Sequence, residues 1–131
     1  MSHFSEIKTN LKNSTTLKKA LKAMGFEVVE AESGVDVRGY FGDSLKAEFK
    51  ILTSTHYDIG FVKDETGNYQ VVGDWELLPK VSNIEQELFT NHLKQEYAKT
   101  AIVETAQAQG YEVETVVDEE TGNIEMVVTQ W

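Results

Sequence analysis

The chain has 131 residues, of which 40% are apolar and one is proline, so we expect one globular domain over residues 1–131. Its 22 acidic and 12 basic residues give a formal net charge of -10, which disfavours nucleic-acid binding because that needs clustered lysine and arginine. The chain has no cysteine and no apolar run long enough for a bilayer, so we expect no disulfide, no thiolate chemistry, no membrane association and a cytoplasmic location.

A strand and a helix are predicted first. Residues 3–11 alternate partly between polar and apolar, which predicts a short strand. Residues 15–24 place their apolar side chains at helical spacing, with lysines on the opposite face. Asn13 or Ser14 offers the oxygen that caps the helix, and Gly25 is suited to the left-handed residue that ends it.

Two further strands are predicted before the middle of the chain. Residues 26–31 (FEVVEA) form the first, and residues 47–54 (AEFKILTS) form the second. Between them, residues 32–46 predict a short strand followed by a turn, because three glycines there can adopt backbone angles closed to other residues: Gly34, Gly39 and Gly42.

The segment from Thr55 to Leu78 predicts a β-hairpin. Two apolar and aromatic runs flank the polar sequence Asp64–Gly67, which suits a four-residue turn. Pro79 is expected to close the hairpin, because proline cannot donate a hydrogen bond to a strand ladder.

A long helix and a second hairpin complete the prediction. Ser82 and Glu85 have the spacing of a capping box, which predicts a helix over residues 84–108 that ends near Gly110. Its expected apolar stripe consists of Ile84, Leu88, Phe89, Leu93, Tyr97, Ala101 and Ile102. The last segment predicts a hairpin with its turn at residues 118–122. Together the elements indicate an α+β fold: a mainly antiparallel sheet of about six or seven strands, with one short and one long helix packed on one face.

Titratable residues gather around the first hairpin. His56 and Asp58 are two residues apart, so in a strand they share a face and would suit a general base with its orienting carboxylate. The other interpretation, which the pattern favours, makes His56 an exposed polar residue. Arg38 would either clamp a ligand's carboxylate or phosphate, or pair with Asp58 or Asp74, and the second is favoured.

Metal sites and common catalytic motifs find no support in the spacing of residues. The three histidines, His3, His56 and His92, do not have the spacing of a zinc site, and the acidic turns lack the pattern of a calcium loop. Phosphate-binding glycine loops and a nucleophilic serine motif are absent. We therefore expect no metal and no cofactor.

Two tryptophans are candidates for partner contacts. Trp75 and Trp131 have the residue type enriched in binding hot spots. For Trp75 a place in the core is favoured, whereas for Trp131 a partner contact and the covering of a sheet edge are equally supported. The residues we predict for ligand or partner binding are Arg38, Tyr40, His56, Asp58, Asp74 and Trp75.

Four segments carry a family resemblance: residues 1–9, 35–42 (VDVRGYFG), 57–76 (YDIGFVKDETGNYQVVGDWE) and 94–106. In these segments the chain resembles the hypothetical chloroplast reading frame thirty-five family of plastids and cyanobacteria, part of a wider bacterial and phage family with a domain of unknown function. The resemblance implies no established activity, cofactor or catalytic residue. Members of that family often neighbour a ferredoxin and an AAA-class ATPase in genomes, which implies a protein partner of one of these classes.

The sequence thus supports two principal functions. The favoured one is a small, acidic, cytosolic protein without enzymatic activity that binds a protein partner through its surface. The alternative is a small-molecule-binding or enzymatic domain with a polar pocket around Arg38, His56, Asp58 and Asp74. A third interpretation, an acidic mimic of nucleic acid, would need carboxylates arrayed on one face, whereas here they are spread over the whole sequence.

Overall fold

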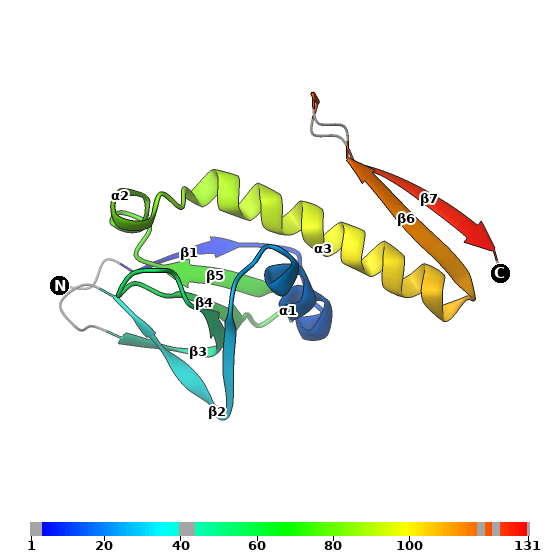
Figure 1. The fold of residues 1–131 in the computed structure, drawn as a ribbon. Helices are drawn as coiled ribbons and strands as arrows, with labels where there is room; N and C mark the ends of the chain where they lie inside the picture. The colour runs from blue at the N-terminus through cyan, green and yellow to red at the C-terminus, as the bar shows by residue number, and fades with distance from the viewer. Residues whose placement is uncertain (1–3, 40–43, 118–119, 122–123, 131) are drawn as a thin grey trace. The chain divides into compact units, whose positions relative to one another are not determined.

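The computed structural model describes residues 4–39, 44–117, 120–121 and 124–130 (Figure 1). The elements are, in chain order, β1 (Ser5–Lys8), α1 (Ser14–Ala23), β2 (Val28–Arg38), β3 (Ser44–Ile51), β4 (Ile59–Lys63), β5 (Tyr69–Gly73), α2 (Leu78–Ser82), α3 (Gln86–Ala108), β6 (Tyr111–Val117) and β7 (Ile124–Gln130). They form two compact units, Met1–Tyr97 and Ala98–Trp131. The fold is α+β, as predicted, while the single domain stays a prediction.

The first unit is built on a five-stranded sheet in the order β1-β5-β4-β3-β2. Every neighbouring pair is antiparallel (Figure 1). The first strand in the sequence, β1, pairs with the last strand of this sheet, β5, with Ser5 opposite Gly73. β1 and β2 therefore form the two edges of this sheet.

The predicted hairpin is confirmed as β4 and β5. Asp64 organises the turn: its Oδ1 accepts hydrogen bonds from the backbone N–H groups of Thr66 at 2.8 Å and Asn68 at 3.1 Å. Gly67 has a φ of 86°, a left-handed conformation that glycine adopts without strain. These local contacts explain why the turn could be located from the sequence.

The first predicted helix is confirmed as α1. The Asn13 side chain accepts a hydrogen bond from the Thr16 N–H at 3.0 Å, which is the expected N-terminal cap. Gly25, at a φ of 93°, ends the helix as predicted, and the Phe26 N–H then donates to the Leu21 carbonyl at 3.1 Å.

The glycine-rich stretch differs from the prediction. Residues Val28–Arg38 form one long strand, β2, where a strand, a second short strand and a turn were expected. Gly34 has a φ of 90° and marks a shift in register against β3 between Glu30 and Val35. The glycine is thus used for an irregularity within the strand, which lets pairing with β3 resume beyond it.

The predicted capping box is wrong. Ser82 is the last residue of α2, a five-residue helix that was not predicted, and its Oγ donates to the Leu78 carbonyl at 2.6 Å. Pro79 lies in the first turn of α2, where a proline needs no N–H partner, and Asn83 ends that helix in a left-handed conformation. The long helix begins at Gln86 instead, so its predicted location is confirmed and its predicted start is not.

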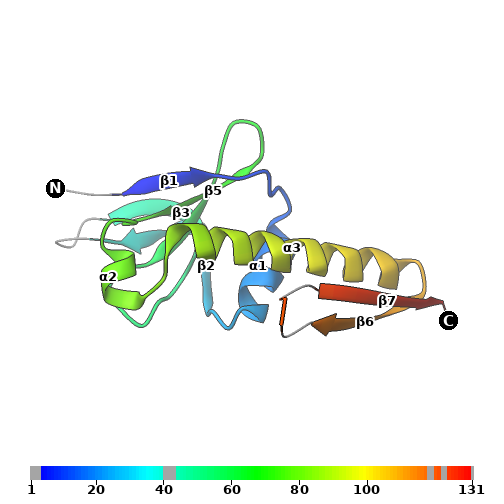
Figure 2. The same cartoon turned by 90° about the horizontal axis from the view of Figure 1, so that it is seen from above.

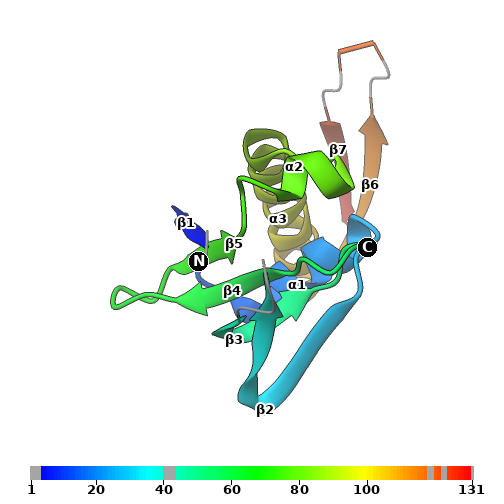
Figure 3. The same cartoon turned by 90° about the vertical axis from the view of Figure 1, so that its left-hand side faces the viewer.

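The helices α1 and the N-terminal half of α3 cover one face of the five-stranded sheet (Figure 3). Phe49 and Phe61 stack there at a centroid distance of 5.0 Å, and both side chains are fully buried. The main core consists of Leu11, Leu17, Ala20, Leu21, Phe49, Ile51, Ile59, Phe61, Tyr69, Val71, Trp75, Leu78, Phe89 and Leu93. A smaller cluster of Val35, Val37 and Ala47 also forms.

Gly60 provides the space for the smaller cluster, and alanine in its place should destabilise the protein. A Cβ atom at Gly60 would lie 2.3 Å from Val37 Cγ2 and 3.1 Å from Ala47 Cβ. We expect Gly60→Ala to lower the free energy of unfolding in urea by about 1–3 kcal/mol, the usual cost of overpacking. In a Val37→Ala background, where the clashing methyl group is gone, the same change should cost less. An equal cost in both backgrounds would contradict this explanation.

The second unit contains the end of α3 and the two-stranded sheet of β6 and β7. These strands pair antiparallel from Tyr111 opposite Gln130 to Val117 opposite Ile124, which confirms the predicted C-terminal hairpin. Its predicted turn at residues 118–122 lies largely outside the described residues. The strands of the described chain are thus divided between two sheets rather than joined in one.

Candidate functional site

The Asp58 carboxylate lies in the first unit and has no solvent exposure. Oδ1 accepts from Arg38 Nη2 at 2.8 Å, and Oδ2 accepts from Arg38 Nε at 3.0 Å and from Lys50 Nζ at 2.9 Å. The backbone N–H of Arg38 donates to Oδ2 as well, at 2.8 Å. The Asp58 carboxylate therefore binds the cationic side chains of Arg38 and Lys50 and the backbone N–H at the end of β2.

Three strands bring these groups together. Arg38 ends β2, Lys50 lies in β3 opposite Gly60, and Asp58 comes directly before β4. The Asp58 N–H donates to the Arg38 carbonyl at 3.1 Å, so the backbones of the two residues are also joined. Lys50 Nζ donates in addition to the Asp36 carbonyl at 2.7 Å. The cluster thus ties the far end of β2 to the centre of the sheet.

The electrostatic balance keeps Asp58 ionised. Burial by itself raises the pKa of this carboxyl, but the hydrogen bonds from Arg38 and Lys50 outweigh it and hold the pKa below the usual 3.8. The same contact raises the pKa of the Arg38 guanidinium. A carboxylate whose oxygens are occupied by four donors is a poor proton acceptor, which argues against a role as a general base.

The contribution of Asp58 to stability should disappear in acid. The folded-state pKa of Asp58 lies below the usual value of 3.8. The ionised carboxylate therefore stabilises the fold fully at a pH above 3.8, the pKa expected in the unfolded chain. The stabilisation is lost as the pH falls through the folded-state pKa, since a protonated Asp58 resembles asparagine. The difference in free energy of unfolding between the natural chain and Asp58→Asn, measured in urea from neutral pH down to about pH 3, should therefore shrink. A difference that grows on acidification would contradict the assignment.

Among the other predicted site residues that the structure describes, none hydrogen-bonds to the Asp58 side chain. His56 is exposed, and the side-chain contacts of Asp58 go to Arg38 and Lys50, so the proposed dyad does not form. The favoured interpretations of Arg38 and His56 are the ones that the structure supports. Tyr40 and Trp131 lie outside the described residues.

Asp74 and Trp75 lie in the connection between β5 and α2 and stabilise it. Asp74 is buried, and its Oδ1 accepts from the Leu77 N–H at 3.2 Å, which caps the turn that leads into α2. Trp75 is buried as well, and its ring lies 5.9 Å from that of Phe89, which confirms its expected place in the core. Asp74 Oδ2 and Trp75 Nε1 have no hydrogen-bond partner within the described residues.

Sequence reasoning missed the surface on either side of the first turns of α3. A hollow of about 240 Å³ is lined by Met24, Phe26, Asn83, Ile84, Glu85, Leu88, Phe89 and His92. Leu88 is 66% exposed there, although the predicted apolar stripe would bury it. Phe89 and Leu93, four residues apart, lie on the buried face of α3. Leu88 is rotated by about 100° from Phe89 around the helix axis, which places it at the edge of that face.

A second hollow, of about 520 Å³, lies on the other side of the same helical segment. It is lined by Ile7, Glu85, Gln86, Glu87, Thr90 and Asn91. Ile7 comes from β1 and the remaining residues come from the start of α3 or directly precede it. No sequence motif indicated this hollow, because its two walls are almost eighty residues apart.

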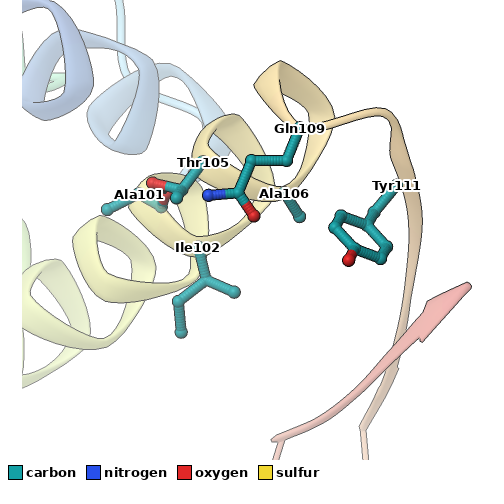
Figure 4. Close-up of a pocket in the computed structure, with 6 residues that line it drawn as sticks. All are labelled: Ala101, Ile102, Thr105, Ala106, Gln109 and Tyr111. Carbon is teal, nitrogen blue, oxygen red and sulfur yellow. Dashed lines mark hydrogen bonds between the residues drawn. The ribbon is translucent and has the colours of Figure 1, made fainter. Parts of the chain in front are cut away.

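The second unit has a hollow of its own, of about 430 Å³. Figure 4 shows the Tyr111 side chain, from β6, opposite the last turns of α3. The lining is Ala101, Ile102, Thr105, Ala106, Gln109 and Tyr111. Ile102, which the predicted stripe would bury, is 46% exposed. This lining offers apolar contact and few groups for catalysis.

The described residues contain neither a cluster of metal ligands nor a membrane-spanning helix. No group of three or more histidine, aspartate or glutamate side chains is arranged to hold a metal ion in this part of the chain. Among the helices that the structure describes, none combines the length and the apolar character needed to cross a membrane.

Comparison with known proteins confirms the resemblance. The family model described as a protein of unknown function (DUF1257) matches residues 20–127. The chain is 29% identical to an uncharacterized protein ycf35 of Cyanophora paradoxa and 32% identical to that of Guillardia theta, in both cases over the whole chain and 98% of the relative. The ycf35 protein of Pyropia yezoensis is 28% identical over the same extent. No solved structure matches.

Proposed function

The chain belongs to the DUF1257 family of proteins of unknown function, and from this premise we propose that it is a small, acidic, cytosolic accessory protein that binds a protein partner and is not an enzyme. The AAA-class ATPase and the ferredoxin that the family resemblance suggests are the first partners to test. The apolar surface at the start of α3 carries the proposal.

Leu88 is the central residue of that surface. With 66% of its area in contact with solvent, it is the most exposed of the large hydrophobic side chains described. It borders the hollow lined by Met24, Phe26 and Ile84. Val81, in α2, is 47% exposed close by in the sequence. Apolar side chains exposed around a hollow are typical of protein contact sites, because their burial by a partner is favourable.

The polar-pocket alternative has less support. Asp58 is fully buried, and its oxygens are already occupied by Arg38 and Lys50. Asp74 caps a turn, and His56 contributes to none of the three hollows around α3. The charged residues of the predicted pocket therefore stabilise the fold. The exposed surface at the start of α3 offers mainly apolar area for contact with a partner.

The test is a comparison of Leu88→Asp with Ile102→Asp, an equivalent change at an exposed position near the other end of α3. Each chain is immobilised and used to capture proteins from the native host, and the captured proteins are quantified by mass spectrometry. We expect Leu88→Asp to reduce the recovery of a specific partner at least about tenfold, because a carboxylate there would have to lose its water on contact. Ile102→Asp should leave recovery unchanged.

Two results would contradict the proposal. The first is equal recovery with all three chains, which would place the contact elsewhere. The second is the recovery of no specific protein by the natural chain. Far-UV circular dichroism of both variants provides the folding control.

A further inference from the structure

The acidic hollow of about 520 Å³ between β1 and the start of α3, here called the groove, indicates how a partner would bind as well as where. We propose that this groove accepts an extended peptide segment of a partner, rich in lysine or arginine, which pairs with β1 as an additional strand of the sheet. The inference rests on the proposed function, since it specifies how a protein partner is recognised.

The first support is the open edge of the sheet. β1 pairs with β5 on one side, and within the described residues no strand pairs with its other side. An edge strand presents unpaired backbone N–H and C=O groups, which an extended peptide satisfies by forming a new ladder. Ser5 and Lys8, the ends of β1, are both exposed. Within the described residues, the outer edge of β1 is thus free to pair with a partner strand.

The second support is the helix beside this edge. In two views β1 runs along the N-terminal half of α3 (Figures 1 and 2). Ile7 of β1 packs partly against the core and also lines the hollow of about 520 Å³. A strand added next to β1 would place alternate side chains over this hollow, because side chains alternate between the two faces of a sheet. Backbone pairing would supply affinity, and the hollow would select side chains.

The third support is the charge of the lining. Glu85 and Glu87 are exposed carboxylates at the hollow, and its other lining residues are uncharged: Ile7, Gln86, Thr90 and Asn91. The cation nearest along β1, Lys8, lines a different hollow with Lys63 and Asp64. Alternation along the strand places Lys8 on the face opposite to Ile7. Lysine or arginine side chains of the peptide would therefore meet two carboxylates, and no cation is among the described residues that line the hollow.

The opposite edge of the sheet suits a partner strand less well. β2 is interrupted by the shift in register between Glu30 and Val35, and such an irregularity disfavours continuous pairing. None of the hollows described here combines residues of β2 with a helix wall as β1 and α3 do. Within the part of the chain that the structure describes, the β1 edge is the one that offers both a free strand edge and a hollow for side chains.

The experiment selects short linear peptides from a random display library on the immobilised full-length chain. We expect enriched peptides to carry lysine or arginine at alternate positions, separated by β-branched or aromatic residues. Glu87→Lys should weaken binding of a selected peptide at least about tenfold, because it reverses the charge that attracts the peptide. Glu112→Lys, with the same change in net charge at an exposed position of β6, is the matched control. Hydrogen exchange should slow at amides of Ser5–Lys8 when the peptide binds.

Three outcomes would overturn the inference: no enrichment, enrichment of apolar residues at helical spacing, or equal weakening by Glu87→Lys and Glu112→Lys. Glu87 is chosen because Glu85 borders both hollows, whereas Glu87 lines only the one beside β1. Leu88→Asp should leave peptide binding intact. If partner capture depends on Leu88 while peptide selection fails, strand addition is wrong and the proposed function stands. If capture succeeds without depending on Leu88 and selection also succeeds, the site at Leu88 is the part that is wrong.

Discussion

Asp58→Asn is expected to lower the free energy of unfolding by about 3 kcal/mol, near the lower end of the cost of removing one partner from a buried charge cluster. The change leaves Lys50, which is 13% exposed, beside a neutral amide, and it removes the paired oxygens that hold the Arg38 guanidinium. Arg38 is 46% exposed and can regain water, which keeps the expected cost from being larger. Urea denaturation at neutral pH measures it.

Asp36→Asn is the matched control for this measurement. The Asp36 carboxylate pairs with Lys46 at 3.3 Å, but both side chains are about two-thirds exposed, at 64% and 66%. Solvent screens such a pair, so we expect its loss to cost less than about 1 kcal/mol. If the two substitutions had similar effects, the buried cluster would not be a main support of the fold.

Phe61→Ala is expected to have the largest effect, a loss of about 3–5 kcal/mol in the free energy of unfolding. Phe61 is fully buried in the centre of the sheet, where its ring stacks on Phe49 at 5.0 Å. Removing the ring leaves a cavity between the sheet and the helices, and the neighbouring strands hold their positions through backbone pairing on both sides. The chain therefore cannot collapse easily around the missing atoms.

The control for Phe61→Ala is Val81→Ala, which also shortens an apolar side chain but at a position that is 47% exposed. We expect it to change the free energy of unfolding by about 0.5 kcal/mol or less. Thermal unfolding monitored by circular dichroism provides a second measurement of both variants. A small effect of Phe61→Ala would mean that the stacked pair is not the centre of the core.

The start of α3 shows where a local signal was misread. Ser82 and Glu85 have capping-box spacing, but Ser82 completes α2 and bonds back to the Leu78 carbonyl. The choice between ending one helix and starting another depends on how Leu78, which is fully buried, anchors α2 in the core. The burial of Leu78 involves residues distant in the sequence, so it cannot be recognised from the few consecutive residues that define a helix cap.

The hollows at the start of α3 could be predicted least. Leu88 was assigned to the buried stripe, and neither hollow at the start of α3 was foreseen. A helix has a buried side only in relation to what it covers, and the sheet and α1 are distant from α3 in the sequence. The residues predicted as a polar pocket were recognised by type, whereas their roles depend on their neighbours in space.

The amino-acid sequence by itself determined the α+β class, the helix α1 with its caps and the β4–β5 hairpin with its turn. These features follow from contacts between residues a few positions apart, such as Asn13 with Thr16 and Asp64 with Thr66. Only the tertiary structure decided that Asp58 meets Arg38, 20 residues away, and that Ile7 and Glu87 share a groove. The physical reason is that strand order and register set which distant side chains adjoin, and both result from burying the whole apolar face at once.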